Sequence, residues 1–211
     1  TTGGITSVTL TSTVSGTTTI TGVSSGLTTG IVNVTVSPAS PSSVTATGGT
    51  GQTGQAGVAL GTAFEVQVKD TFGNVNPGVT VTFAVVSGGG SITPTTATTD
   101  SNGEASATAT AGGTLGTQTF TATFTALTAV TFNVTVSPGP PTKLALETST
   151  GTVTAGGTPA NLTVTIQDQF GNTVTAASNT VTFSASPNTS VTFGAIGGPT
   201  NGIVTSTFVS T

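Results

Sequence analysis

The side chains that carry most enzyme chemistry are missing from this sequence. The chain of 211 residues has no His and no Cys, which removes the imidazole base, the thiolate nucleophile and the usual zinc, haem and iron–sulfur ligands. Residues 22–26 match the nucleophile elbow G-x-S-x-G, but the serine has no histidine to act as its base. We therefore predict that the protein is not an enzyme.

Two other motifs point to ligands but fit polar loops better. Residues 49–54 match G-x-G-x-x-G, yet the next periodic segment has the pattern of a strand and not of the helix that a dinucleotide site needs. Asp100, Asn102 and Glu104 lie close together without the spacing of a calcium-binding loop, and a polar turn before a strand explains them. We expect no cofactor and no metal site.

Charge and hydropathy restrict the partners. Two Lys against six acidic residues leave a net charge of −4, too little positive charge for nucleic-acid binding. The longest apolar runs are far shorter than the roughly 18 residues that cross a bilayer, so we expect no membrane span in this chain. Copies of the chain itself are the expected partners, with host or cell-surface glycans as a further candidate.

The strand pattern predicts an all-β fold. Only 4% of residues are charged, and the sequence is rich in Thr, Val and other β-branched residues that suit a pleated surface. Residues 62–69 and 79–86 alternate apolar with polar side chains, as a half-buried strand does. Further strands are predicted at 104–111, 117–125 and 129–137.

An internal repeat sets the domain organisation. The segment V-N-V-T-V-S-P at 32–38 recurs as F-N-V-T-V-S-P at 132–138, 100 residues later. This period matches one whole β-sandwich domain of about seven short strands. We predict a string of such sandwiches in an elongated array: the C-terminal strands of one domain at 1–38, a complete domain at 39–138, and the N-terminal strands of another at 139–211.

A turn motif carries a family resemblance. The pattern D-x-F-G-N between two strands, followed by V-T-F and by a D-x-N-G-x-A segment, resembles bacterial immunoglobulin-like domains of the invasin and intimin type. The matching residues are Asp70, Phe72, Gly73, Asn74, Val81, Phe83, Asp100, Asn102, Gly103 and Ala105, and in the second copy Asp168, Phe170, Gly171, Asn172, Val181 and Phe183. The resemblance implies that the chain folds as tandem immunoglobulin-like β-sandwiches, one complete and two partial. It also implies a spacer or display arm of a surface adhesin.

The two turns should be structural sites. We expect Phe72 and Phe170 to be buried under the rim of the sandwich, because a large apolar side chain in a polar turn needs a pocket. Gly73 and Gly171 should have positive φ, which glycine adopts without strain.

The phase of the repeat leaves two partial domains. The first should expose Ile20, Leu27, Val32, Val34 and Val36, and the last should expose an inner face with Leu162, Val164, Ile166, Val181 and Phe183. We predict that residues 1–38 of a neighbouring subunit, or a continuation of the chain, complete the last domain by strand addition, which would propagate a fibre head to tail.

The function follows from these patterns. We predict a structural subunit or repeat section of an extracellular or cell-surface filament or adhesin stalk. The alternative is a carbohydrate- or surface-binding module of a secreted enzyme or phage fibre, although Trp and Tyr, the usual sugar-stacking residues, are absent. Candidate N-glycosylation sites are Asn33, Asn133, Asn161 and Asn188.

Overall fold

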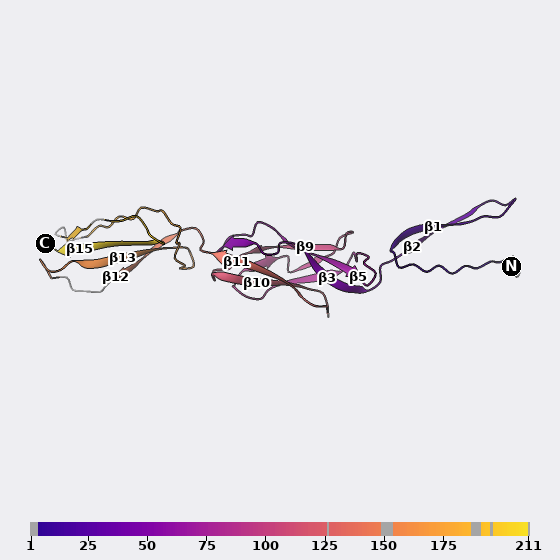
Figure 1. The fold of residues 1–211 in the computed structure, drawn as a ribbon, viewed down its shortest axis with the longest axis horizontal. Helices are drawn as coiled ribbons and strands as arrows, with labels where there is room; N and C mark the ends of the chain where they lie inside the picture. Colours follow the sequence, from indigo (N-terminus) through magenta and orange to yellow (C-terminus); the bar gives the residue numbers. More distant parts are fainter. Residues whose placement is uncertain (1–3, 126, 149–153, 187–190, 195, 211) are drawn as a thin grey trace.

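The structure, a computed structural model, is built entirely of strands and loops in the part of the chain that it describes. It describes residues 4–125, 127–148, 154–186, 191–194 and 196–210. Three parts follow one another along an elongated molecule (Figure 1): a hairpin at the N-terminal end, a middle unit, and a last unit at the opposite end. The predicted all-β fold is confirmed.

The middle unit is a sandwich of two sheets. Its strands are β3 (Pro41–Gly48), β4 (Thr53–Gln55), β5 (Phe64–Asp70), β6 (Thr80–Val85), β7 (Ser91–Thr93), β8 (Thr96–Thr98), β9 (Glu104–Thr110), β10 (Gly116–Thr123) and β11 (Val130–Ser137). One sheet has the order β3-β5-β9-β7 and the other the order β4-β11-β10-β6-β8. The five strands predicted from alternation correspond to β5, β6, β9, β10 and β11, with ends that differ by no more than two residues.

Alternating side chains from both sheets form the core of the middle unit. Phe64, Val66 and Val68 of β5 are fully buried, and the residues between them are not. The Phe64 ring stacks on Phe132 of the opposite sheet at a centroid distance of 4.5 Å and lies 5.1 Å from Phe120. This burial is what holds the two sheets together.

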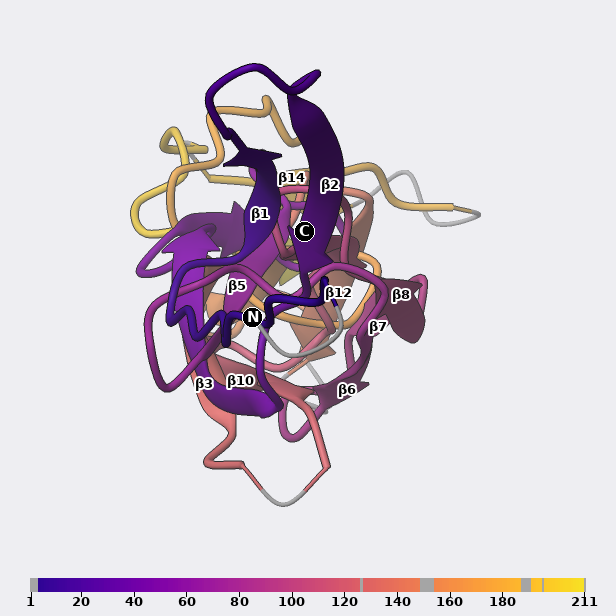
Figure 2. The same cartoon turned by 90° about the vertical axis from the view of Figure 1, so that its right-hand side faces the viewer.

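The hairpin repeats the last two strands of the middle unit. Strands β1 (Gly16–Gly22) and β2 (Gly30–Val36) pair antiparallel with Gly16 opposite Val36. Strands β10 and β11 pair in the same register 100 residues later, with Gly116 opposite Val136. Figure 1 shows the hairpin projecting from one end of the middle unit, and Figure 2 shows it end-on, in front of that unit.

The last unit has a counterpart of only one sheet of the sandwich among its described residues. Its strands β12 (Lys143–Thr148), β13 (Ala160–Gln167), β14 (Val191–Phe193) and β15 (Ile203–Ser210) form a sheet of order β12-β13-β15-β14. This order matches β3-β5-β9-β7 of the middle unit. Residues 178–185, which correspond to β6, form no strand. Strand β6 pairs with β10 in the middle unit, and the last unit has no described counterpart of β10.

Three motifs set aside in the sequence lie in loops and at the ends of strands. Gly22 ends β1 and residues 23–26 lie at the turn of the hairpin, residues 49–52 form the loop between β3 and β4 while Thr53 and Gly54 belong to β4, and Asp100 begins the turn before β9. Within the described ranges, no helix is long and apolar enough to cross a bilayer.

Candidate assembly interface

The D-x-F-G-N turn after β5 is organised around one carboxylate. Asp70 is 3% exposed, and its Oδ1 accepts hydrogen bonds from the main-chain N–H groups of Phe72 (2.8 Å) and Asn74 (2.9 Å). Its Oδ2 accepts from the main-chain N–H of Ala39 (2.8 Å) and from Nδ2 of Asn74 (2.9 Å). Ala39 belongs to the segment that joins the hairpin to the middle unit, so one side chain holds both the turn and this linker.

The turn after β13 repeats this arrangement. Asp168 accepts from the main-chain N–H groups of Phe170, Asn172 and Gly139, and from Nδ2 of Asn172, all at 2.9 Å. Gly139 lies in the linker between the middle and last units, 100 residues after Ala39. Two copies of the motif therefore build the same network at the two linkers.

These hydrogen bonds set the ionisation of both carboxyl groups. Burial raises the pKa of Asp70, but the hydrogen bond from the Asn74 side chain and those from three main-chain N–H groups outweigh it and lower the pKa from 3.8 to about 2. The pKa of Asp168 is lowered as well, since burial again raises it but hydrogen bonds from Asn172, Gly139 and Phe170 outweigh the burial. Both carboxylates are charged at neutral pH.

The glycines of the turns behave as expected and the phenylalanines do not. Gly73 and Gly171 have φ of 86° and 91°, which confirms the prediction for both. The Phe72 and Phe170 side chains are 57% and 48% exposed, so the prediction that they are buried under the rim of their own unit is wrong. The turns lie at the ends of their units. The Phe72 and Phe170 rings each lie close to residues of the preceding part of the chain.

The hairpin exposes apolar side chains that its counterpart buries. Leu27 is 72% exposed, Val32 is 55% exposed, and Ile20, Val34 and Val36 are only partly buried. Four of these five positions have counterparts on β10 and β11 that are at most 3% exposed: Phe120, Phe132, Val134 and Val136. The counterpart of Leu27 is Leu127, which lies in the loop between those strands and is only partly buried. The hairpin therefore has the apolar face of a strand pair that packs in a sandwich core, but this face is not buried in a core here.

The inner face of the last unit is more deeply buried than the sequence predicts. Leu162, Val164, Ile166 and Val181 are buried, and Phe183 packs against their cluster, so the prediction that this inner face is exposed is wrong for the first four. The segment around Val181 covers the sheet although it forms no strand.

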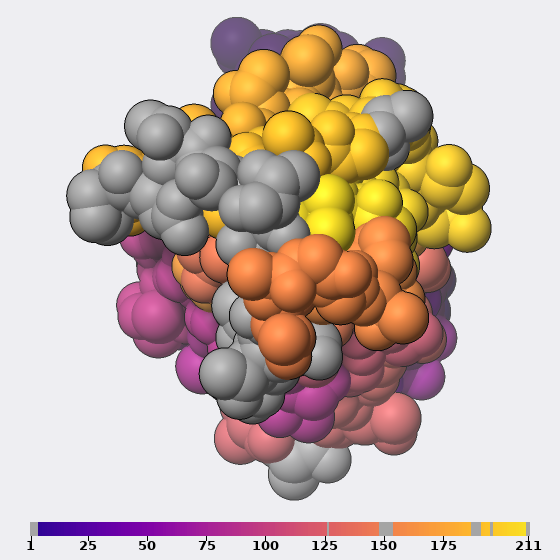
Figure 3. All heavy atoms as spheres, turned by 90° about the vertical axis from the view of Figure 1, so that its left-hand side faces the viewer, coloured from indigo at the N-terminus to yellow at the C-terminus, as the bar shows by residue number. Residues whose placement is uncertain are grey.

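The exposed apolar side chains of the last unit lie instead on β12. Leu144 and Leu146 pair with Ile166 and Val164 of β13 and so share their face of the sheet, yet they are 55% and 54% exposed. A groove of about 260 Å³ runs between Leu144 and Val181. Figure 3 shows β12, in orange, at the surface of the end that carries the C-terminus. The spacing of Leu144 and Leu146 two residues apart, between Lys143 and Glu147, is the signal in the sequence that identifies them.

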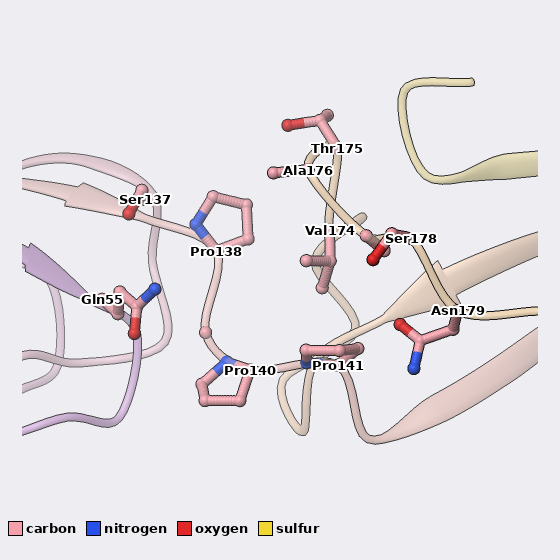
Figure 4. Close-up of a pocket in the computed structure, with 12 residues that line it drawn as sticks. Gln55, Ser137, Pro138, Pro140, Pro141, Val174, Thr175, Ala176, Ser178 and Asn179 are labelled. Carbon is pink, nitrogen blue, oxygen red and sulfur yellow. The ribbon is translucent and has the colours of Figure 1, made fainter. Parts of the chain in front are cut away.

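A hollow at the second linker has no acid–base groups. It has a volume of about 420 Å³, and Figure 4 shows Pro138, Pro140 and Pro141 along one side and Val174 and Ser178 on the other. No Asp, Glu or Lys is among the residues that line it. In the described part of the chain, no three acidic side chains gather as a metal site would require.

Three of the four sequons lie on exposed strand positions. Asn33, Asn133 and Asn161 are exposed, on β2, β11 and β13. Asn188 lies outside the described residues.

The fold is similar to that of bacterial immunoglobulin-like domains of known structure. The structure resembles the Escherichia coli adhesin FdeC with a TM-score of 0.53 and 24% identity, over 85% of this chain and 60% of that one. It also matches invasin, a bacterial integrin-binding protein (TM-score 0.40, 21% identity, 80% of this chain and 34% of that one), and domains 4–9 of the surface-layer protein SbsC (TM-score 0.38, 22% identity, 93% and 31%). The chain has the tandem immunoglobulin-like fold of bacterial adhesin domains, as the sequence motif predicted.

The comparisons of sequence add no narrower assignment. No family model matches the chain, and no curated protein matches it. The chain spans less than two thirds of FdeC, so the activity of a whole adhesin is not transferred to it.

Proposed function

We propose that this chain is a structural section of an extracellular, cell-surface filament or adhesin stalk. The likeness of its fold to an adhesin, a surface rich in Thr and Ser, and the scarcity of charged side chains support a role in extension and display. In this proposal residues 1–38, 39–138 and 139–211 are the end of one domain, a complete domain and the beginning of another.

We further propose that the hairpin of one copy completes the last unit of another by strand complementation. The observation that carries this proposal is the match between the two exposed parts. The hairpin has the register of β10 and β11 without their core, and the last unit has no described counterparts of those strands while Leu144, Leu146 and a groove beside Val181 stay open.

Burial of apolar side chains would supply most of the energy of such a contact. The five apolar side chains of the hairpin contribute on the order of 10 kcal/mol, at about 1.5 to 3 kcal/mol each, before the cost of ordering. A strand added to the open sheet also pairs main-chain groups that would otherwise form an aggregation-prone edge. Since donor and acceptor lie at opposite ends of the chain, the contact does not close on itself and extends as a fibre.

The test uses the 211-residue chain and two variants of the hairpin. Val34→Asp places a charge on the apolar face, and Thr35→Asp places the same charge on the opposite, exposed face as a matched control. We expect filaments, seen by electron microscopy and sedimentation, from the unaltered chain and from Thr35→Asp but not from Val34→Asp. Filaments formed by Val34→Asp, or by a chain without residues 1–38, would contradict strand complementation. So would a hairpin that folds back onto residues 139–211 of its own chain.

Exposed sequons support glycosylation of the same surface. We propose N-glycans on Asn33, Asn133 and Asn161 when the producing cell has the pathway. An intact mass equal to that of the unmodified chain would contradict this.

A further inference from the structure

We propose that the D-x-F-G-N turn of each unit is a joint that grips the preceding unit and fixes the angle between the two. The grip lies inside one chain, between consecutive parts, so it is independent of whether copies polymerise. The partner of each turn is the loop that precedes the final hairpin of the unit before it.

The asparagine of the turn makes the polar part of the grip. Asn172 Nδ2 donates to the main-chain carbonyl of Gly113 at 2.9 Å, across 59 residues of sequence. Asn74 Nδ2 donates in the same way to the carbonyl of Thr13 at 2.9 Å, and its Oδ1 accepts from the N–H of Ser15 at 3.0 Å. Thr13 and Gly113 are 100 residues apart, so the same contact is built twice, at both junctions.

The carboxylate beneath each asparagine holds it in place. Asp168 Oδ2 accepts from the same Nδ2 group that reaches Gly113, and it also accepts from the N–H of the linker residue Gly139. A single aspartate therefore fixes the turn, the linker and the side chain that contacts the preceding unit. Because the turn, the linker N–H and the Asn172 side chain all donate hydrogen bonds to one buried carboxylate, rotation of the linker is restricted.

The aromatic ring of the second turn makes the apolar part of the grip. A Cβ built on Gly113 would lie 2.5 Å from Cδ1 of Phe170, and one built on Gly57 would lie 2.7 Å from Cε2 of the same ring. The ring thus sits where side chains at these two positions would be, against the backbone of the middle unit. This explains why Phe170 is only half exposed although its own unit gives it no pocket. At the first junction Phe72 borders a small hollow with Thr13 and Val36.

The two parts of the contact differ in what they require of the preceding unit. The polar acceptor is a main-chain carbonyl, which every residue provides, so Thr13 and Gly113 serve equally well. The apolar part at the second junction requires residues without a side chain, Gly57 and Gly113.

The test measures the spread of distances between the middle and last units. Because the chain has no native cysteine, Thr108→Cys on β9 and Thr205→Cys on β15, both exposed, can carry spin labels. Double electron–electron resonance on the labelled full chain should give one narrow distance distribution. We expect Asn172→Ala and Gly113→Ala each to broaden or shift it.

The controls separate a joint from general loosening. Asn102 lies in a similar aspartate turn within the middle unit, where its side chain donates a hydrogen bond to Asp100 of the same turn, so Asn102→Ala should leave the distribution unchanged. Adding Phe170→Ala to Gly113→Ala should have little more effect than Phe170→Ala alone, since the ring atoms at 2.5 and 2.7 Å are then gone and only the Cβ of residue 170, at 3.1 Å, remains close to the new methyl group. Gly113→Ala alters no residue of the last unit, so it tests the joint even if Asn172→Ala weakens its own turn. A distribution for Gly113→Ala identical to that of the unaltered chain would overturn the proposal, whatever the result for filaments.

Discussion

Phe132 and Val32 occupy the same position on two hairpins 100 residues apart, and replacing each with alanine should have very different effects. Phe132 is 1% exposed and stacks on Phe64 at 4.5 Å, so Phe132→Ala should destabilise the middle unit by about 3 to 5 kcal/mol. Val32 is 55% exposed, so Val32→Ala should change the stability of the unassembled chain by no more than about 0.5 kcal/mol.

Val32→Ala should affect filament formation although it changes the stability of the unassembled chain little. If the hairpin enters the groove of another copy, Val32 is buried there, and the loss of two methyl groups costs about 1.5 kcal/mol. That cost weakens each contact about tenfold and raises the concentration needed for filaments by a similar factor.

The absence of Trp and Tyr determines how unfolding of these variants is measured. Since the chain has no Trp or Tyr, urea unfolding is followed by far-UV circular dichroism, and the critical concentration by sedimentation. An equal loss of stability for the two variants in the unassembled chain would show that the hairpin is already packed in a core. An unchanged critical concentration for Val32→Ala would show that this face is not part of the filament contact.

Two further outcomes follow from the turns. The pKa of Asp70 lies near 2 in the folded chain against 3.8 ordinarily, so its contribution to stability is complete above about pH 4 and is lost as the pH falls towards 2. Thermal unfolding midpoints should therefore be constant between about pH 5 and 9, because the chain has no His to titrate there. Below about pH 4 the midpoints should fall, and they should fall less steeply in Asp70→Asn. A transition near pH 6 would contradict this. Because the Phe72 ring is 57% exposed, Phe72→Ala should cost no more than about 1 kcal/mol in urea unfolding, and a loss of 3 kcal/mol or more would show that the ring is buried in solution.

The features that the sequence predicts correctly depend on local pattern. Alternation in 62–69 and 129–137 determines which side chains face a core without any knowledge of neighbouring strands. The repeat of 100 residues fixes the equivalence of the two hairpins, and hence the exposed face of β2. Positive φ at Gly73 and Gly171 follows from the turn alone.

The features that it misses depend on contacts across long stretches of chain. Phe170 has a pocket, but the preceding unit provides it, through Gly113 and Gly57 that lie 57 and 113 residues earlier. The inner face of the last unit is covered by residues around Val181 that fold over it without forming a strand, and the periodicity of that segment predicts only a strand. In each case the sequence correctly identifies an apolar side chain that needs to be buried. The path of the linker determines which residues bury Phe170, and the fold of the loop around Val181 determines which residues bury the inner face. The turn motif at the end of a repeated domain therefore contacts the preceding domain as well as its own, because this end of the unit is where its neighbour lies.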